Sequence, residues 1–303
     1  MSLTDRTVVV TGGTGGIGKE IARALAGLGA RVIVTGRDPH RAATVVDELR
    51  VGTGNPAVDA VCADITRQRD LRALARAVTD RCGSLYALVN NAGVNPARRE
   101  LTEDGVETAF AGNVLAPYLL TRLLLPALER TRRDGGGVAR VVNTAGGVPR
   151  GRLDPDNLQA EKAFSGWVTD TQYNRSKLAM MAMTRTLAER VDAAGVAVVV
   201  AYPGHAHTEM NRSLPLGAYP RLLRPVVPLL KPLMPVLWGD AAAPARNAVR
   251  LVGATDAEAR AAHAHYLGLR GRFAPWPAAT DDPLVRERIW RMCERLTTAT
   301  GPA

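Results

Sequence analysis

Cysteine is scarce in this chain, with Cys62, Cys82 and Cys293 as the three occurrences in 303 residues. They are scattered and lack the close spacing of metal ligands, which argues against a disulfide framework and a zinc site. Three reduced thiols are the expected state. We therefore predict no metal site.

Long apolar runs are also missing. Runs such as Ala194 to Tyr202 fall well short of the roughly 18 to 20 residues needed to cross a bilayer. The N-terminus lacks the basic and then apolar pattern of a signal peptide. With 46% hydrophobic residues, the chain is still long enough to bury a substantial core. We expect a cytoplasmic protein without a membrane span.

Lysine is nearly absent, so the formal net charge of +10 comes mainly from arginine. The arginines are dispersed, with no block longer than pairs such as Arg98-Arg99 and Arg132-Arg133. Nucleic-acid sites instead gather basic residues on one face. We interpret the charge as a solvated surface shaped by a GC-rich genome, and we predict no nucleic-acid partner. Phe and Trp are also few, and the sequence leaves a homo-oligomer open.

Short β-branched apolar runs alternate with helical patterns along most of the chain. Strands that are apolar throughout and alternate with helices indicate a parallel sheet covered on both faces. This pattern predicts a doubly wound (Rossmann) α/β fold in a single domain, 1–303. The expected strands are 7–11, 31–35, 58–62, 85–90, 140–144 and 196–202, and the expected helices include 41–49, 70–81, 106–130 and 170–191.

Ligands of such folds bind beyond the carboxyl ends of the strands, so we expect the loops there to carry the chemistry. The segment that follows the last expected strand, 209–238, carries six prolines among leucines and valines, which forbids a long regular helix. It fits either an apolar lid over a substrate pocket or an interaction surface for a partner or membrane. Its position just beyond a strand's carboxyl end favours the lid.

A glycine-rich loop follows the first strand and opens its helix, with glycines at 12, 13, 15, 16 and 18. Backbone N–H groups and the helix N-terminus can approach a pyrophosphate there without obstruction by Cβ atoms. A merely tight turn is the alternative. The position between a strand and a helix favours a dinucleotide site.

Arg37 stands at the end of the second strand, where an NAD site would place an acidic residue on the adenosine ribose. An acid would repel a 2′-phosphate, whereas a guanidinium pairs with it in bidentate fashion. The sequence therefore predicts NADP(H). The neighbouring Asp38 could occupy Arg37 instead.

Several motifs together resemble the short-chain dehydrogenase/reductase family across most of the chain. They are TGGTGGIG at 11–18, Asp64-Ile65, NNAG at 90–93, YNRSK at 173–177 and Pro203-Gly204. The segments at 110–121 and 37–38, and the C-terminal GRF followed by IWRMCERL, are similar to the retinol-dehydrogenase-like branch. That resemblance implies a bulky apolar carbonyl or alcohol as substrate, with NADP(H).

The resemblance also implies residue roles. Tyr173 would be the general acid, Lys177 would lower the pKa of that tyrosine and hold the nicotinamide ribose, and Asn113 would anchor a water relay. A tyrosine titrates near 10 unperturbed, and a lysine four residues later on a helix supplies a nearby cation. The implied cofactor-binding residues are Gly12, Thr14, Gly15, Gly16, Ile17, Gly18, Arg37, Asp64, Ile65, Asn90, Ala92, Gly93, Tyr173, Lys177, Pro203, Gly204 and Thr208.

One position departs from the family pattern, because Gly146 stands where most relatives carry a serine whose hydroxyl donates to the substrate oxygen. Losing such a donor slows other enzymes by about 100- to 1,000-fold. The substrate could supply its own hydroxyl, or Ser165 or Thr169 could reach in, or the protein could bind NADP(H) without catalysis. Thr144 is expected to lie about 6.5 Å too deep to substitute. Alternatively, Gly146 serves only a turn that needs a positive φ.

The three preserved residues favour an enzyme. The sequence predicts an NADPH-dependent ketoreductase for a bulky, hydrophobic, polycyclic or aromatic substrate, with natural-product tailoring as an associated role. The alternatives are a retinol- or sterol-type alcohol dehydrogenase and a non-catalytic NADP(H)-binding regulator.

Overall fold

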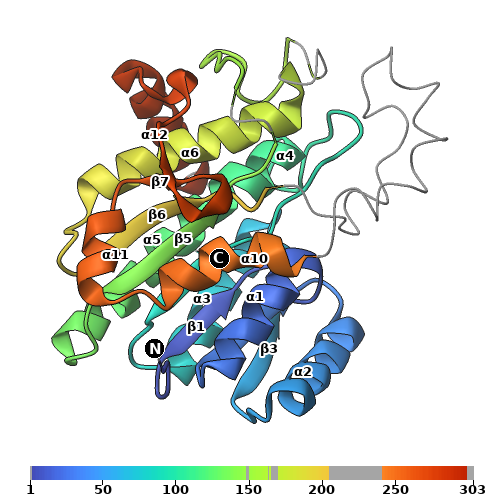
Figure 1. Cartoon of the computed structure of the whole chain (residues 1–303). Helices are drawn as coiled ribbons and strands as arrows, with labels where there is room; N and C mark the ends of the chain where they lie inside the picture. The colour runs from blue at the N-terminus through green and yellow to red at the C-terminus, as the bar shows by residue number, and fades with distance from the viewer. Residues whose placement is uncertain (1, 148–149, 163, 165–169, 205–240, 299–303) are drawn as a thin grey trace.

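The computed structural model describes residues 2–147, 150–162, 164, 170–204 and 241–298. In this part of the chain a sheet of eight strands has the order β3-β2-β1-β4-β5-β6-β7-β8 (Figure 1). Neighbouring strands pair in parallel except β7 and β8, which are antiparallel. The strands are β1 (Thr7–Val10), β2 (Arg31–Gly36), β3 (Val58–Cys62), β4 (Ala87–Asn90), β5 (Ala139–Thr144), β6 (Val196–Ala201), β7 (Tyr266–Leu267) and β8 (Phe273–Ala274).

Helices cover both faces of the sheet, which confirms the predicted doubly wound α/β fold. Because side chains alternate along a strand, Val8 and Val10 pack into the core under α1, α2 and α10, while Val9 packs into the core under α3, α5 and α6. The helices of the two layers are α1 (Gly16–Gly27), α2 (Pro39–Thr53), α3 (Gln68–Arg81), α5 (Ala116–Arg133), α6 (Gln172–Arg190) and α10 (Ala242–Val252).

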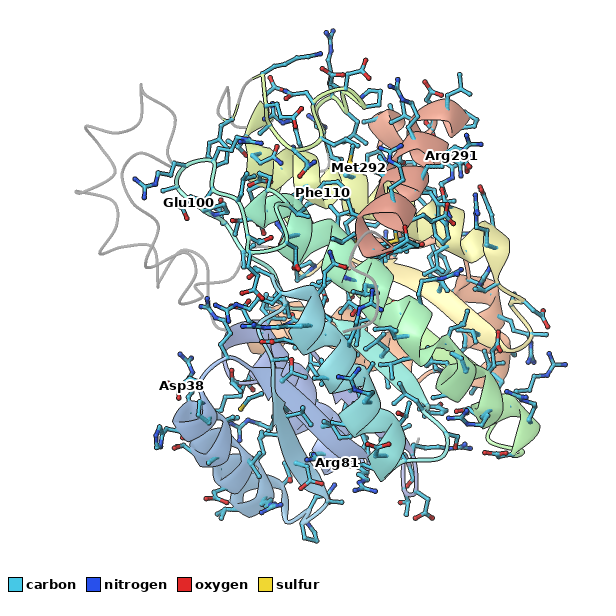
Figure 2. All side chains as sticks on the ribbon, turned by 180° about the vertical axis from the view of Figure 1, so that it is seen from behind. Asp38, Arg81, Glu100, Phe110, Arg291 and Met292 are labelled. Atoms are coloured by element: carbon cyan, nitrogen blue, oxygen red, sulfur yellow. The ribbon has the colours of Figure 1, made fainter. Side chains whose placement is uncertain are left out.

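The helix predicted over 106–130 is interrupted near its start. It consists of α4 (Thr108–Phe110), a π-helical turn η1 (Ala111–Leu115) and α5, and Phe110 lies in the interior (Figure 2). By length and composition, Thr108–Arg133 would suffice to span a membrane. However, 78% of its most apolar window is buried inside the protein, as in the core helix of a globular fold.

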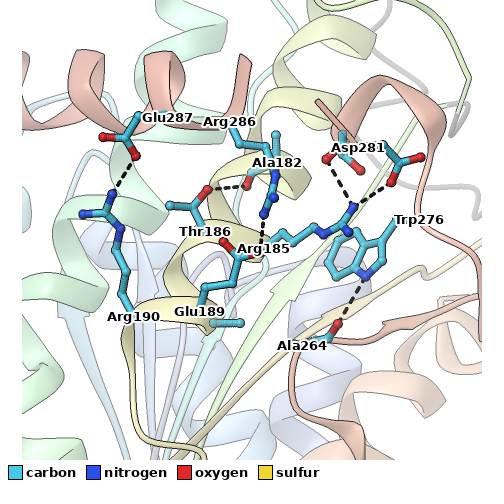
Figure 3. A network of polar contacts seen from close by, with 12 residues as sticks. Ala182, Arg185, Thr186, Glu189, Arg190, Ala264, Trp276, Asp281, Arg286 and Glu287 are labelled. Atoms are coloured by element: carbon cyan, nitrogen blue, oxygen red, sulfur yellow. Dashed lines mark hydrogen bonds and ion pairs between the residues drawn. The ribbon is translucent and has the colours of Figure 1, made fainter. Parts of the chain in front are cut away.

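The C-terminal part adds α11 (Asp256–Ala262), two short 3₁₀ turns, η5 (Leu269–Gly271) and η6 (Ala278–Thr280), and α12 (Pro283–Thr298). Helix α12 packs against α6, and its fully buried Trp290 meets the Tyr118 ring of α5 edge-on at 4.9 Å. Ion pairs also join α6 to α12 and to the residues just before it (Figure 3), namely Arg190 with Glu287 at 2.7 Å, Arg185 with Asp281 at 2.7 Å, and Arg286 with Glu189. Each pair has at least one solvent-exposed member, and such pairs contribute little each, so the apolar contact carries most of the stabilisation.

Strand β1 lies between β2 and β4. From β1 the strands β2 and β3 extend the sheet to one side, and β4, β5 and β6 extend it to the other. Such a switch point opens a crevice at the carboxyl ends of the strands, where ligands of this architecture bind. The predicted lid, 209–238, lies outside the described residues.

Candidate active site

A cavity of about 460 Å³ lies at the carboxyl ends of the strands. Tyr173 and Lys177 line it, and so do most of the residues predicted to bind the cofactor. Asn90 and Asn113 do not line it, and Thr208 lies outside the described residues. The other predicted residues on its wall are Gly12, Thr14, Gly15, Gly16, Ile17, Gly18, Arg37, Asp64, Ile65, Ala92, Gly93, Pro203 and Gly204.

The glycine loop requires glycine at several of its positions. Gly12 adopts a φ of +66° and Gly16 a φ of +50°, both in the left-handed region that glycine tolerates. A Cβ atom at Gly18 would lie 2.2 Å from the Gly12 carbonyl oxygen, so the close packing of α1 on this loop requires glycine. Gly15 precedes α1 and brings no side-chain cap, which leaves the first N–H groups available for an anion.

Arg37, which was predicted to bind the 2′-phosphate of the adenosine ribose, directly follows β2. Arg37 is exposed and lines the cavity. The Asp38 carboxylate accepts hydrogen bonds from the backbone N–H of His40 (2.9 Å) and of Arg41 (3.3 Å), and so caps α2 at the periphery of the molecule (Figure 2). Asp38 therefore has a structural role at the helix start, in addition to its position beside Arg37.

A second arginine near the end of β2, Arg41, was not identified from the sequence. The Arg41 side chain donates through Nε to the Thr14 carbonyl oxygen at 2.9 Å. A Cβ atom at Gly15 would lie 2.5 Å from its Nη2 atom. The guanidinium thus covers the glycine loop, and its spacing of four from Arg37 was the available signal.

Asp64 and Ile65, which were predicted to bind the cofactor, follow β3. The Asp64 carboxylate accepts from the Thr66 backbone N–H at 2.9 Å and from its hydroxyl at 2.8 Å. Ile65 is nearly buried and contributes an apolar wall. These contacts fix both predicted residues at the end of β3.

Tyr173 and Lys177 lie one turn apart on α6, whose start Thr171 caps by accepting from the Asn174 N–H at 3.2 Å. The Lys177 ammonium donates to the Thr144 carbonyl oxygen at 3.1 Å, at the end of β5. The helix therefore brings the phenol and the amine to the same wall of the cavity, as their spacing predicted.

Burial perturbs both groups. It raises the pKa of Tyr173 to about 12, with a smaller contribution from Tyr202. It lowers the pKa of Lys177 to about 8. The shift of the tyrosine is opposite to the predicted lowering, because desolvation outweighs any attraction by the nearby amine.

Asn113 lies behind the cavity, in the turn η1. Its side chain accepts from the Val94 N–H at 2.8 Å and donates to the Val94 carbonyl at 2.9 Å and to the Ser176 hydroxyl at 2.9 Å. A Cβ atom at Gly93 would lie 2.9 Å from Asn113 Oδ1 and 3.3 Å from Lys177 Nζ. Asn113 thus joins the loop after β4 to helix α6; the water relay remains a prediction.

Asn90 is buried, and its amide donates to Asn143 Oδ1 at 2.8 Å and to the Thr121 hydroxyl at 3.2 Å. The next residue, Asn91, lines the cavity and donates to the Thr11 carbonyl at 3.1 Å. Asn90 therefore bonds across the interior, whereas Asn91 lines the cavity.

Gly146 also lines the cavity, directly beside Tyr173. A Cβ atom there would lie 2.6 Å from the Tyr173 hydroxyl oxygen and 3.3 Å from Lys177 Cε. The positive φ of the turn, +68°, belongs to Gly147, so close approach of the phenol, rather than backbone conformation, accounts for glycine at 146. The Thr144 hydroxyl is buried and has no hydrogen-bond partner among the described residues. Ser165 and Thr169 lie outside them.

Within the described residues, no group of three or more His, Cys, Asp or Glu side chains is arranged to hold a metal ion.

Comparison with known proteins identifies relatives of this arrangement. The family model of the short chain dehydrogenases matches residues 6–154 and 157–217. Mouse polyprenol dehydrogenase is 35% identical over 98% of this chain and 85% of its own length. Human retinol dehydrogenase 12 is 37% identical over 70% of this chain and 65% of its own length. A putative daunorubicin C-13 ketoreductase, DnrU, from Streptomyces sp. (strain C5) is 36% identical over 72% of this chain and 71% of its own length.

Among solved structures, the RhlG/NADP complex from Pseudomonas aeruginosa is similar, with a TM-score of 0.66 and 28% identity. The match covers 89% of this chain and 96% of that one. The structural match extends over nearly the whole described sheet and its helices, in keeping with the predicted doubly wound fold. The chain therefore belongs to the short-chain dehydrogenase/reductase family, in its retinol-dehydrogenase-like branch, a family of oxidoreductases that bind a nicotinamide cofactor.

Proposed function

We propose that this protein is an NADPH-dependent ketoreductase that reduces a carbonyl on a bulky, hydrophobic, polycyclic aromatic substrate. The observation that carries the proposal is the buried phenol of Tyr173, which lines the cavity one helical turn from Lys177 and beside Gly146. A relative named as a ketoreductase and a structural neighbour solved with NADP support it.

The preference for NADPH follows from the end of β2. Arg37 lines the cavity where a 2′-phosphate would lie, and Arg41 places a second guanidinium over the adjoining glycine loop. Two positive groups near one phosphate favour it through charge-assisted hydrogen bonds. Asp38 is held as the cap of α2, which supports leaving Arg37 for the phosphate.

The nicotinamide cofactor, when bound along the glycine loop, supplies the hydride. Tyr173 holds the proton for the carbonyl oxygen, and a pKa of about 12 keeps its phenol protonated near neutral pH. That protonation state suits a general acid for carbonyl reduction. Lys177 would hold the nicotinamide ribose. Its ammonium donates to the Thr144 carbonyl at the end of β5, which fixes its position.

The substrate side of the cavity is made of small residues. Ala145, Gly146, Gly147 and Gly204 all line it, and none carries a side-chain donor. A hydroxyl beside the carbonyl of the substrate would replace the missing serine hydroxyl. Hydroxylated aromatic ketones combine such a hydroxyl with a bulky ring system, so we propose a natural-product tailoring reaction in the cytoplasm.

The test is the variant Tyr173→Phe, assayed by NADPH oxidation with a panel of aromatic ketones. We expect turnover to fall by about 100- to 10,000-fold, with NADPH affinity unchanged in calorimetry. Tyr86→Phe is the control, because its buried hydroxyl has no partner among the described residues and lies toward the opposite ends of the strands.

Full activity in Tyr173→Phe would refute the role of the phenol. Oxidation of retinol or sterols by the wild type without reduction of any ketone would establish the alcohol-dehydrogenase alternative. NADPH binding without turnover of either class would establish the non-catalytic regulator.

A further inference from the structure

One polar side chain at the Tyr173 end of the cavity has no assigned role. Asn95 lines the cavity and is partly exposed, and its amide has no hydrogen-bond partner among the described residues. Two neighbouring side chains are bonded within the protein, since Asn91 donates to Thr11 and Lys177 donates to Thr144. An unpaired amide on the wall of a binding cavity offers both a donor and an acceptor to a ligand.

The backbone holds Asn95 in place. Both the N–H and the carbonyl of Val94 bond to the side chain of Asn113. Gly93, two residues before Asn95, is close enough to Lys177 that its Cβ position lies 3.3 Å from Nζ. Two residues of chain span at most about 7 Å, so Asn95 lies near the catalytic pair.

The position of Asn95 also indicates which substrate atom it meets. The reacting oxygen must lie at the Tyr173 hydroxyl, which is packed against Gly146 beyond the end of β5. Asn95 follows β4, the neighbouring strand. Adjacent strands lie about 4.8 Å apart, so the amide stands to one side of the reacting carbonyl.

We propose that Asn95 hydrogen-bonds a second oxygen of the substrate, close to but distinct from the reacting carbonyl oxygen, and so selects β-oxygenated ketones. This inference rests on the proposed ketoreductase function. It adds a specificity-determining residue to that site and narrows the substrate class from apolar ketones to ketones with a second oxygen two carbons away. A neutral hydrogen bond of this kind changes affinity by about three- to tenfold.

The experiment uses two probes, benzylacetone and its β-hydroxy derivative, which differ only in the hydroxyl. We expect the wild type to prefer the hydroxyketone in kcat/KM, with Asn95 contributing about three- to tenfold of that preference and any donor effect of the hydroxyl at the reacting oxygen adding to it. In Asn95→Leu, which keeps the branched shape, and in Asn95→Ala, which does not, the preference should fall by that factor. The loss should fall more heavily on the hydroxyketone than on benzylacetone.

Binding of both ketones to the NADP⁺-saturated protein, measured by calorimetry, gives the same ratio without turnover. A wild type that treats the ketones alike, or a preference that is undiminished in both Asn95 variants, overturns the assignment. A preference diminished in Asn95→Ala but undiminished in Asn95→Leu overturns it as well, because side-chain shape would then be the cause. Failure of the ketoreductase function itself is separate, since it appears as binding of ketones without their reduction.

Discussion

Gly146→Ala tests the central geometry of the site. The added Cβ would lie 2.6 Å from the Tyr173 hydroxyl, where ordinary contact begins at 3.4 Å. The phenol must therefore withdraw by about 0.8 Å, or the strand must give way. A misplacement near 1 Å slows a catalytic step by about 100-fold. We expect kcat to fall by about that factor, with the overpacked site destabilised by about 1 to 3 kcal/mol.

Gly146→Ser carries the same Cβ atom and adds a hydroxyl, so comparison of the two variants isolates the donor. On a ketone without a neighbouring hydroxyl, Ser should exceed Ala by about 100-fold or more, the worth of one preorganised donor. On a ketone that supplies its own hydroxyl, the two variants should be equally slow. That difference distinguishes a donor supplied by the substrate from a site that needs none.

The assay is steady-state NADPH oxidation with both ketone types, alongside thermal unfolding and NADPH calorimetry. Gly27→Ala is the matched control, because a Cβ atom at that helical position meets nothing within 4 Å. It should leave kcat unchanged. A kcat for Gly146→Ala within about threefold of the wild type, with unaltered stability, would refute the argument from close approach.

Three further predictions concern Lys177, Arg37 and Tyr202. Burial lowers the pKa of Lys177 from 10.5 to about 8, so between these pH values the unfolded chain holds a proton that the folded protein has released. The contribution of Lys177 to the free energy of unfolding should therefore rise across this window by about 3 kcal/mol, measured as the difference between urea titrations of the wild type and of Lys177→Met. Arg37→Asp should raise the KM for NADPH at least about tenfold and improve NADH, and a parallel loss of both cofactors would contradict the phosphate role. Tyr202→Phe removes a 3.0 Å hydrogen bond to the Gly147 carbonyl and should lower kcat/KM about three- to tenfold, whereas Tyr266→Phe should not.

The sheet could be predicted because its strands are continuous apolar runs. The six predicted strands appear within about two residues of their expected ends, since β-branched runs between glycines leave few alternatives. The π-helical turn at 111–115 could not be predicted, because it accompanies bonds from Asn113 to Val94 and Ser176, residues far apart in sequence. The two-residue strands β7 and β8 likewise exist by pairing at the edge of β6, without a pattern of their own.

The site divides in the same way. The glycine loop and the spacing of Tyr173 and Lys177 are local patterns, and together with Arg37 and the residues that the family resemblance implied they predicted most of the cavity wall. Contacts between distant segments could not be predicted from the sequence. Arg41 reaches the glycine loop only through the packing of α2, and the closeness of Gly146 to Tyr173 depends on how α6 lies against β5. The upward pKa shift of Tyr173 also depends on burial, which sequence spacing does not reveal.

The turn at 145–147 must hold its shape although it is nearly devoid of side chains. Two contacts from residues outside the turn hold its backbone in place. The Tyr202 hydroxyl bonds the Gly147 carbonyl from β6, and Asn174 of α6 lies so close that a Cβ at Gly147 would stand 2.5 Å from its Oδ1. A glycine turn loses more conformational entropy on ordering than any other, so these contacts stabilise the position of Gly146 beneath the phenol. The hydroxyl of Tyr173 thus fills the space that a side chain at 146 would occupy.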